Sequence, residues 1–276
     1  MRPAPRSEKR SAPPTGEKTP ARVHQLSTFL LAAAFVLVLV KLFVPMDSGW
    51  PEALLVLLAT VNTLTALTGQ LPLQNVLLAA FGIALIGGGI SALGATIGIP
   101  FGPLTFGLEA GPAIFKILPW AIPLLWIIVV LNSRGVARLI LRPWRKTRIY
   151  GFWLIGITAT LTMLYDLALD PFAWFIRHYW FWMPTKFPVT WQGAPLVNFL
   201  SWGVVSLLML AFVTPALIRK QPGQKSGPAF HPLAVWLGAI LFFAIASAQQ
   251  GLWMVVIADG IIGLVTAIFA IRGARW

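Results

Sequence analysis

Eight apolar runs, each long enough to cross a bilayer, constrain this chain more than any other feature of its 276 residues. A transmembrane helix needs about 20 mainly apolar residues. The runs are Leu26–Val44, Pro51–Leu67, Leu73–Ile97, Ile117–Asn132, Gly151–Asp170, Leu196–Ile218, Pro232–Ala248 and Leu252–Ile271. The sequence therefore predicts an all-α polytopic membrane protein with about eight transmembrane helices, and seven to nine fit the pattern.

Composition supports a membrane protein and excludes several kinds of site. The chain is 58% hydrophobic and 11% charged, with a mean hydropathy of +0.80, whereas soluble domains are about 45–50% apolar and about 25% charged. It contains no cysteine, which excludes disulfides, thiolate metal sites and a cysteine nucleophile. The net charge of +13 is spread over short segments with no RNA-binding motif, so we expect anionic lipid headgroups as partners rather than nucleic acid.

The first 25 residues differ from the rest of the chain. They are rich in proline and basic residues and show no apolar periodicity, so they cannot bury enough surface to become ordered. Residues 1–25 are predicted to form a disordered tail, and residues 26–276 a single transmembrane domain. The first apolar run lacks a small-residue cleavage site near its end and should remain in the protein as a helix.

Basic residues are distributed unevenly between alternate connections, which predicts the orientation. One side receives seventeen of the 21 lysines and arginines, and the other side receives Lys41, Lys116, Arg177 and Lys186. Cytoplasmic connections of membrane proteins carry the excess of positive charge. We therefore expect both termini in the cytoplasm and the protein in the cell membrane. Six of the eight acids then fall on the outer side.

The stretch LYDLALDPFAWFIRHYWFW, residues 164–182, holds the main candidates for chemistry. Asp166 and Asp170 lie four residues apart, so both side chains project from one helix face. Two carboxyl groups in a low dielectric do not both ionise easily, and the pair is expected to hold a proton that it can donate. Asp170 precedes Pro171 and could alternatively only end the helix at the interface.

Several neighbours of the acid pair are candidate substrate-binding residues. The aromatic run from Phe172 to Trp182 suits an interfacial helix, and its rings could also stabilise a carbocation. Tyr165 and Trp174 are the candidate rings, and His178 is a candidate base or water-positioning group. Asn198, at the outer start of the sixth run, could hold a water. Asp259, in the outer third of the last run, either lines a pocket or hydrogen-bonds a neighbouring helix.

The segment Ala92–Pro112 is too rich in glycine and proline for a continuous helix. Gly94, Gly98 and Gly102 recur every four residues, which permits close backbone approach to another helix or to a flat ligand. Glu109 is the only acid in this segment, which is predicted to be irregular or re-entrant. If the segment re-enters the membrane, Glu109 faces a protein-lined cavity and is a third catalytic candidate.

The sequence shows no motif for a bound cofactor. It contains no HExxH, P-loop, GxSxG or dinucleotide-binding pattern, and its three histidines are far apart in the chain. We therefore expect no metal site and no redox cofactor.

Three segments in this order resemble the membrane-bound carotenoid hydratase family: GIPFGPLTFGLEAGPAIFKILPWAIPLLW (98–126), YDLALDP (165–171) and QGAPLVNFLSW (192–202). The resemblance covers roughly residues 92–202. It implies carotenoid biosynthesis by a hydro-lyase, with cofactor-free addition of water to the terminal isopropylidene double bond of an acyclic carotenoid. The implied partners are a polyene substrate, the lipid bilayer and other enzymes of the pathway. Leu104 and Phe106 stand where the family pattern has tyrosines, and Ser91 where it has a glutamate.

The residues and the resemblance lead to one mechanistic hypothesis. Asp166 or Asp170 protonates the alkene, Tyr165 and Trp174 stabilise the cation, and the second carboxylate or Glu109 activates the water. Two alternatives stay open. One is an intramembrane prenyltransferase, because DxxxD is typical of magnesium-diphosphate sites. The other is a carotenoid- or lipid-binding protein without catalysis, which the absence of tyrosines at Leu104 and Phe106 favours.

Overall fold

A computed structural model of the chain describes residues 18–44, 50–184, 189–218 and 227–276. Within these ranges eight helices are long and apolar enough to cross a membrane, as predicted. They are α1 (Lys18–Phe43), α2 (Trp50–Thr68), α3 (Leu73–Ile97), α4 (Ala121–Ile140), α5 (Tyr150–Pro171), α6 (Leu196–Val213), α7 (His231–Gln249) and α8 (Trp253–Ala274). The predicted tail lies outside the described residues up to position 17, and α1 begins at Lys18.

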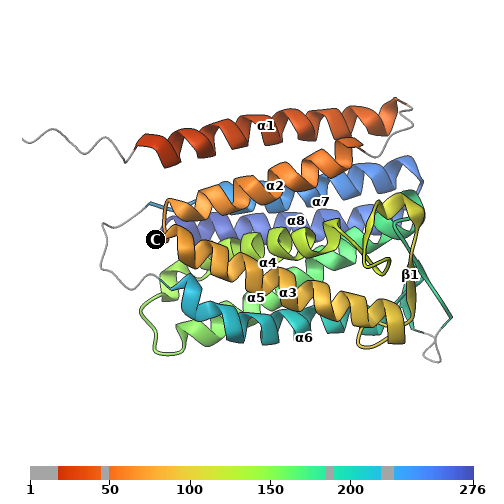
Figure 1. Ribbon diagram of the computed structural model, residues 1–276. Coiled ribbons are helices and arrows are strands. Elements are labelled where there is room, and N and C mark those ends of the chain that lie inside the picture. The colour runs from red at the N-terminus through yellow and green to blue at the C-terminus, as the bar shows by residue number, and fades with distance from the viewer. Residues whose placement is uncertain (1–17, 45–49, 185–188, 219–226) are drawn as a thin grey trace, which may run out of the picture.

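Successive helices run in opposite directions, so the start of α1 and the end of α8 lie at the same end of the bundle (Figure 1). The short strands gather at the opposite end. We call the end with the strands the outer end and the other the inner end, following the charge distribution. The assignment of the inner end to the cytoplasm stays a prediction.

Helix α4 is the central element of the bundle and packs against α2, α3, α5, α7 and α8. Trp126, Val129, Val130 and Val136 on this helix are fully buried. The apolar run predicted to end at Asn132 continues as helix to Ile140. Arg134 in this extension is buried, and its guanidinium donates to the Leu217 carbonyl at 3.1 Å. A charge that is satisfied in this way can remain inside a bundle.

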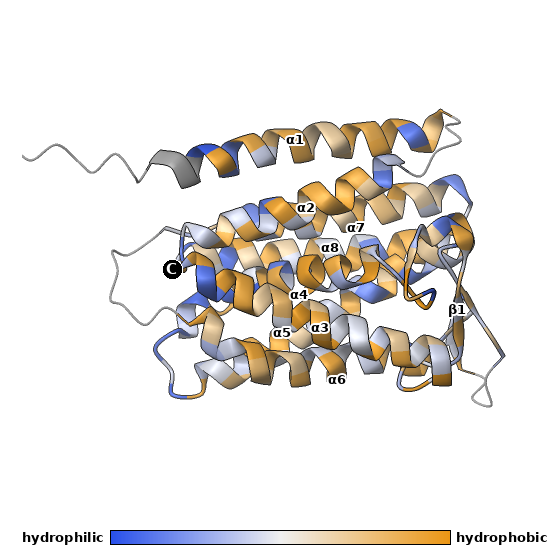
Figure 2. Ribbon diagram, viewed as in Figure 1, coloured by the Kyte–Doolittle hydropathy of each residue, from blue (hydrophilic) through white to orange (hydrophobic). Residues whose placement is uncertain are grey.

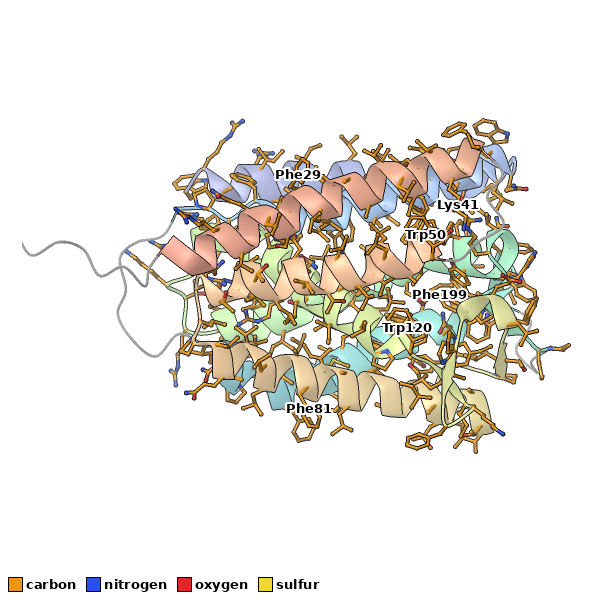
Figure 3. All side chains as sticks on the ribbon, turned by 45° about the horizontal axis from the view of Figure 1, so that its top comes forward. Phe29, Lys41, Trp50, Phe81, Trp120 and Phe199 are labelled. Carbon is orange, nitrogen blue, oxygen red and sulfur yellow. The ribbon has the colours of Figure 1, made fainter. Side chains whose placement is uncertain are left out.

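The helices are mostly apolar along their middle parts and more polar near both ends of the bundle (Figure 2). Phe81 on α3, 65% exposed, points away from the bundle (Figure 3). Large apolar side chains are similarly exposed on α1, α6 and α8. Such a continuous apolar surface fits a lipid environment, and the chain is a multi-pass membrane protein.

Irregular connections cover the outer end of the bundle. Helix α3 ends at Gly98, whose backbone has φ of 74° and donates to the Gly94 carbonyl, a left-handed cap that glycine adopts readily. The glycine- and proline-rich segment then forms no continuous helix. Three small antiparallel pairs follow: β1 (Leu104–Phe106) with β4 (Trp180–Trp182), β2 (Ala113–Ile114) with β3 (Leu118–Pro119), and β5 (Thr190–Trp191) with β6 (Ala194–Pro195).

Four short helical turns complete the part of the chain that the structure describes. They are the 3-10 turns η1 (Leu108–Ala110), η2 (Arg142–Trp144) and η4 (Thr214–Leu217) and the π-helical turn η3 (Phe172–Ile176). Turn η3 continues α5 directly beyond Pro171. A π turn shifts the side chains that follow it around the helix axis, and this one leads the chain from the acid pair into β4.

Candidate active site

Asp166 and Asp170 are both 0% exposed, on the last turns of α5. Their spacing of one helical turn places both carboxyl groups on the face of α5 that points into the bundle. A buried carboxyl group needs hydrogen-bond partners because burial removes it from water.

Each acid has its own set of partners. Asn198 Nδ2 donates to Asp166 Oδ2 at 2.7 Å, across from α5 to α6. Trp180 Nε1 donates to Asp170 Oδ1 at 2.6 Å, and Trp182 Nε1 lies 3.2 Å from both oxygens of Asp170. Asp166 Oδ1 is buried and accepts no hydrogen bond from the described residues. One carboxyl group is thus held by two indoles, and the other keeps one oxygen available.

The pairing of β1 with β4 positions these two tryptophans. In this antiparallel register Leu104 lies opposite Trp182, and Phe106 lies opposite Trp180. Side chains alternate between the faces of a strand, so Trp180 and Trp182 share one face, and their cross-strand partners share it with them. Phe181 points to the other face and is exposed.

A small pocket of about 40 Å³ lies beside the acid pair. This volume holds a few water molecules or part of a small apolar group. Trp202 lines this pocket, and Trp126 stacks behind it with ring centroids 4.0 Å apart and donates from Nε1 to Ser91 Oγ at 3.0 Å. The lining residues are Ser91, Phe101, Leu104, Phe106, Ile122, Leu125, Asp166, Asp170, Trp180, Trp182, Asn198 and Trp202. All three positions that depart from the family pattern therefore face this pocket.

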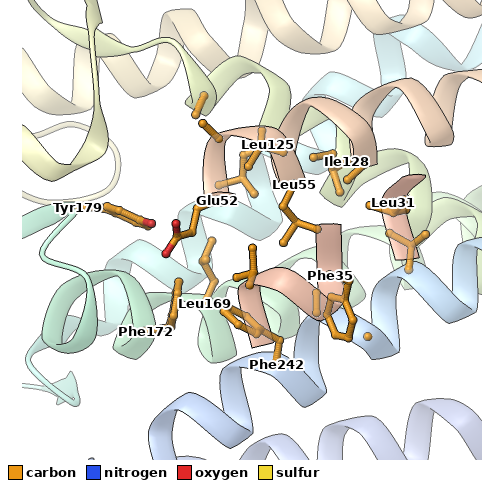
Figure 4. A pocket seen from close by; sticks show the side chains of 18 of the residues that line it. Leu31, Phe35, Glu52, Leu55, Leu125, Ile128, Leu169, Phe172, Tyr179 and Phe242 are labelled. Carbon is orange, nitrogen blue, oxygen red and sulfur yellow. The ribbon is translucent and has the colours of Figure 1, made fainter. Parts of the chain in front are cut away.

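A large, mainly apolar cavity of about 640 Å³ lies on the other side of the same wall. It shares Ile122, Leu125 and Trp180 with the small pocket. Its walls come from α1, α2, α4, α5 and α7 and from the outer connections, and Figure 4 shows side chains such as Leu31, Phe35 and Phe242 around it. A cavity of this size and polarity suits an apolar ligand.

Glu52 lines the large cavity and lies between two basic side chains. Glu52 Oε2 lies 2.7 Å from Lys41 Nζ, and Glu52 Oε1 lies 2.7 Å from Arg177 NH2. The Tyr179 hydroxyl faces the Glu52 carboxylate (Figure 4). Burial raises the pKa of the Tyr179 phenol, and Glu52 adds to this shift, so the hydroxyl keeps its proton.

The structure brings some of the predicted site residues together and separates others. Asp166, Asp170 and Asn198 meet at the small pocket, while Tyr165 is buried and lines the large cavity. Trp174 lines neither space and packs against Phe175 and Phe181. The roles predicted for these side chains stay predictions.

His178, Glu109 and Asp259 lie apart from the acid pair. His178 is exposed on the outer connection, stacked on Phe181, with Nδ1 3.0 Å from the Trp174 carbonyl. Glu109 is exposed in η1 and lines the mouth of the large cavity. Asp259 is 1% exposed on α8, lines neither space and has no hydrogen-bond partner among the described residues.

Sequence reasoning did not single out Trp180, Trp182 and Trp202 individually, nor Glu52. The alternation in WFW (180–182) could have indicated a strand with two indoles on one face. The hydrogen bonds from Trp180 and Trp182 to Asp170 could not be predicted from the sequence, because they depend on the fold. His24 and His231, far apart in the sequence, have ring centroids only 5.0 Å apart. Across the part of the chain that the structure describes, no three His, Cys, Asp or Glu side chains form a metal-binding group.

Fold and site define a class: a multi-pass helical membrane protein whose buried carboxyl pair lies in an aromatic pocket beside a large apolar cavity. Residues 52–266 match the profile of the carotenoid biosynthesis protein family. The chain belongs to this family of carotenoid biosynthesis proteins, which confirms the resemblance seen in the sequence.

One relative carries a more specific name. The chain is 31% identical over 138 residues to bisanhydrobacterioruberin hydratase of Haloarcula japonica. This match covers 49% of the chain and 44% of the relative, so it spans less than half of either protein. No solved structure matches the chain.

Proposed function

We propose that the protein adds water to the terminal isopropylidene double bond of an acyclic carotenoid. The observation that carries this proposal is the buried acid pair in an aromatic pocket that shares a wall with the large apolar cavity. The name of the similar hydratase supports the same reaction class.

The two spaces suggest how a polyene is held. A polyene is apolar along its length, and the large cavity offers it apolar walls from five helices. Its end group turns past the wall formed by Ile122, Leu125 and Trp180 into the small pocket. The alkene then lies beside the carboxyl groups, and the rest of the chain stays out of water.

Asp166 acts as the acid in this proposal. Its Oδ1 accepts no hydrogen bond from the described residues and can carry a proton. Transfer of that proton to the less substituted alkene carbon forms a C–H bond from the π electrons and leaves a tertiary cation. Trp180, Trp182 and Trp202 line the pocket, and their rings stabilise the positive charge in this proposal.

Asp170 acts as the base. Its two indole donors hold it as a carboxylate aimed at the pocket. A water attacks the cation through an oxygen lone pair, Asp170 takes the proton that this water loses, and a tertiary alcohol results. Passage of that proton from Asp170 to Asp166, one helical turn away, restores the starting state. The sum is the addition of one water without a change in electron count, so the reaction itself needs no redox cofactor.

The setting of the reaction follows from the topology. We place the acid pair near the outer leaflet of the cell membrane, with both termini in the cytoplasm, on the strength of the charge distribution. Water reaches the pair from this side. Other enzymes that make or modify the polyene are natural neighbours in the same membrane.

The test is expression in a lycopene-producing host, with mass spectrometry of the extracted pigments. The wild-type protein should yield pigments heavier by one or two waters, and Asp166→Asn should lower this yield by about 10²-fold or more, because proton transfer contributes 10²–10⁴-fold. Thr162→Val is the matched control, since Thr162 is buried one turn deeper on α5 and its hydroxyl donates to the Thr158 carbonyl of the same helix.

Pigment that co-purifies with the wild-type protein without gaining water would contradict hydration. That outcome would indicate a carotenoid-binding protein without catalysis.

A further inference from the structure

The large cavity ends on a polar cluster at its inner end, which is unexpected for a cavity built to hold a hydrocarbon. We call this the inner polar cluster. It joins α1, α2 and α7 and consists of His24, Ser27, Thr28, Asn62, Thr65 and His231. Thr28, Asn62 and His231 line the cavity.

Asn62 is the centre of the cluster and is 0% exposed. Its Nδ2 donates to Ser27 Oγ at 3.0 Å and to Thr28 Oγ1 at 2.8 Å. Its Oδ1 contacts His231 Nε2. Both amide hydrogens and the oxygen are therefore in use, and Asn62 on α2 contacts both α1 and α7.

The contact with Asn62 determines what His231 can offer to a ligand. An amide oxygen only accepts hydrogen bonds, so His231 Nε2 must carry the hydrogen. In a neutral imidazole the other nitrogen, Nδ1, is then an acceptor. No other described residue bonds this nitrogen, and His231 lines the cavity. The two rings lie 5.0 Å apart, which disfavours charge on both His231 and His24.

The inner polar cluster and the outer part of the cavity are well separated. On α7 the lining runs from His231 to Phe243, which is about 18 Å at 1.5 Å per residue. An extended chain that spans the cavity thus has one end near the wall shared with the small pocket and the other end at His231. If the inner polar cluster only held the helices together, His231 would not need to line a cavity. We therefore infer that a polar group of a ligand contacts His231 there.

We propose that the inner polar cluster is a subsite for a hydroxyl group. The preferred ligand is an isoprenoid chain with a terminal alkene at one end and a hydroxyl at the other, and that hydroxyl donates to His231 Nδ1. The identity of the chain as an isoprenoid rests on the proposed function, whereas the need for a donor group rests on the hydrogen bonding of His231 alone.

Three probes of equal chain length test the subsite: geranylgeraniol, its methyl ether and the corresponding hydrocarbon without oxygen. Geranylgeraniol has an isopropylidene group at one end and a hydroxyl at the other. Equilibrium binding to the purified full-length protein in lipid nanodiscs is measured by mass spectrometry of the retained probe. The alcohol should bind roughly fivefold more tightly than the ether and the hydrocarbon, the size of effect expected for one buried hydrogen bond.

Variants separate the subsite from general packing. His231→Phe keeps a ring but removes the acceptor, and it should bind all three probes equally, at the wild-type affinity for the hydrocarbon. His231→Gln keeps an acceptor and should retain part of the preference, which also covers the case in which the Phe variant does not fold. Trp191→Phe, a substitution outside both spaces, should leave the preference intact.

Equal binding of the alcohol and the ether by the wild-type protein would overturn the proposal. So would a preference that survives in His231→Phe. Selective retention of the alcohol without any hydration would instead contradict the proposed function and leave the subsite standing, because binding is measured without turnover.

Discussion

Trp180 Nε1 donates a hydrogen bond of 2.6 Å to Asp170 Oδ1, and both side chains are buried. The bond joins strand β4 to the last turn of α5 and fixes the carboxylate at the small pocket. Trp180→Phe keeps an aromatic face and removes the donor. A hydrogen bond to a charged group contributes about 1.5–3 kcal/mol, so hydration yield should fall roughly 10- to 100-fold.

The control for this substitution is Trp191→Phe. Trp191 Nε1 also donates to α5, but to the Leu167 carbonyl at 3.2 Å, and it lines neither space. Pigment analysis of the two variants under equal expression compares the donors directly. Similar yields from both would argue against a role for the indole of Trp180 at Asp170.

Trp202 lines the small pocket and stacks on Trp126, with ring centroids 4.0 Å apart. If its ring stabilises a cation, Trp202→Phe should retain much of the hydration, whereas Trp202→Leu should lose about tenfold more, in line with a cation–π contribution of 1–2 kcal/mol. Pigment bound per protein should be alike in the two variants. Equal hydration by the Phe and Leu variants would contradict cation stabilisation by this ring.

Gly238 on α7 lines the large cavity, and a Cβ atom there would meet only Phe35 Cζ, at 4.0 Å. Gly238→Leu should therefore fold but fill part of the cavity, reducing pigment retention severalfold. Gly260→Leu on α8 is the matched control, because its Cβ would meet no atom within 4 Å and the residue is exposed. Absorbance of co-purified pigment measures both. Unchanged retention in Gly238→Leu would place the polyene elsewhere.

Glu52 bridges Lys41 and Arg177 at 2.7 Å each, with all three side chains mostly buried. Glu52→Gln leaves two cations without the carboxylate between them and should destabilise the protein by roughly 2 kcal/mol, less than a fully buried pair would cost. Thermal unfolding in detergent measures this as a lower Tm.

The double variant Glu52→Gln, Arg177→Gln tests the pairing. Its Tm should fall by less than the sum of the two single-variant shifts, because the second substitution removes one of the two cations that face position 52. Strict additivity of the Tm shifts would contradict coupling between Glu52 and Arg177.

Parts of the site were predictable because they follow from spacing within one helix. Residues four apart on a helix share a face, so the sequence places Asp166 and Asp170 together. Asn198 lies near the start of the sixth apolar run, which is predicted to begin on the membrane side where the fifth run ends. The roles of Tyr165 and Trp174 were assigned from nearness in sequence. The structure instead lines the small pocket with Trp180, Trp182 and Trp202, since the π turn η3 and the pairing of β1 with β4 redirect the chain.

The sequence by itself determined the eight spanning helices, because hydrophobic length is a property of each segment alone, and its charge distribution predicts that the acid pair lies toward the outer side of the membrane. Only the tertiary structure decided which distant polar groups meet: Asn198 with Asp166, Trp180 with Asp170, and His231 with Asn62, which is 169 positions away. Helix packing makes these contacts, and in an apolar interior each polar group must find a partner that the packing brings to it.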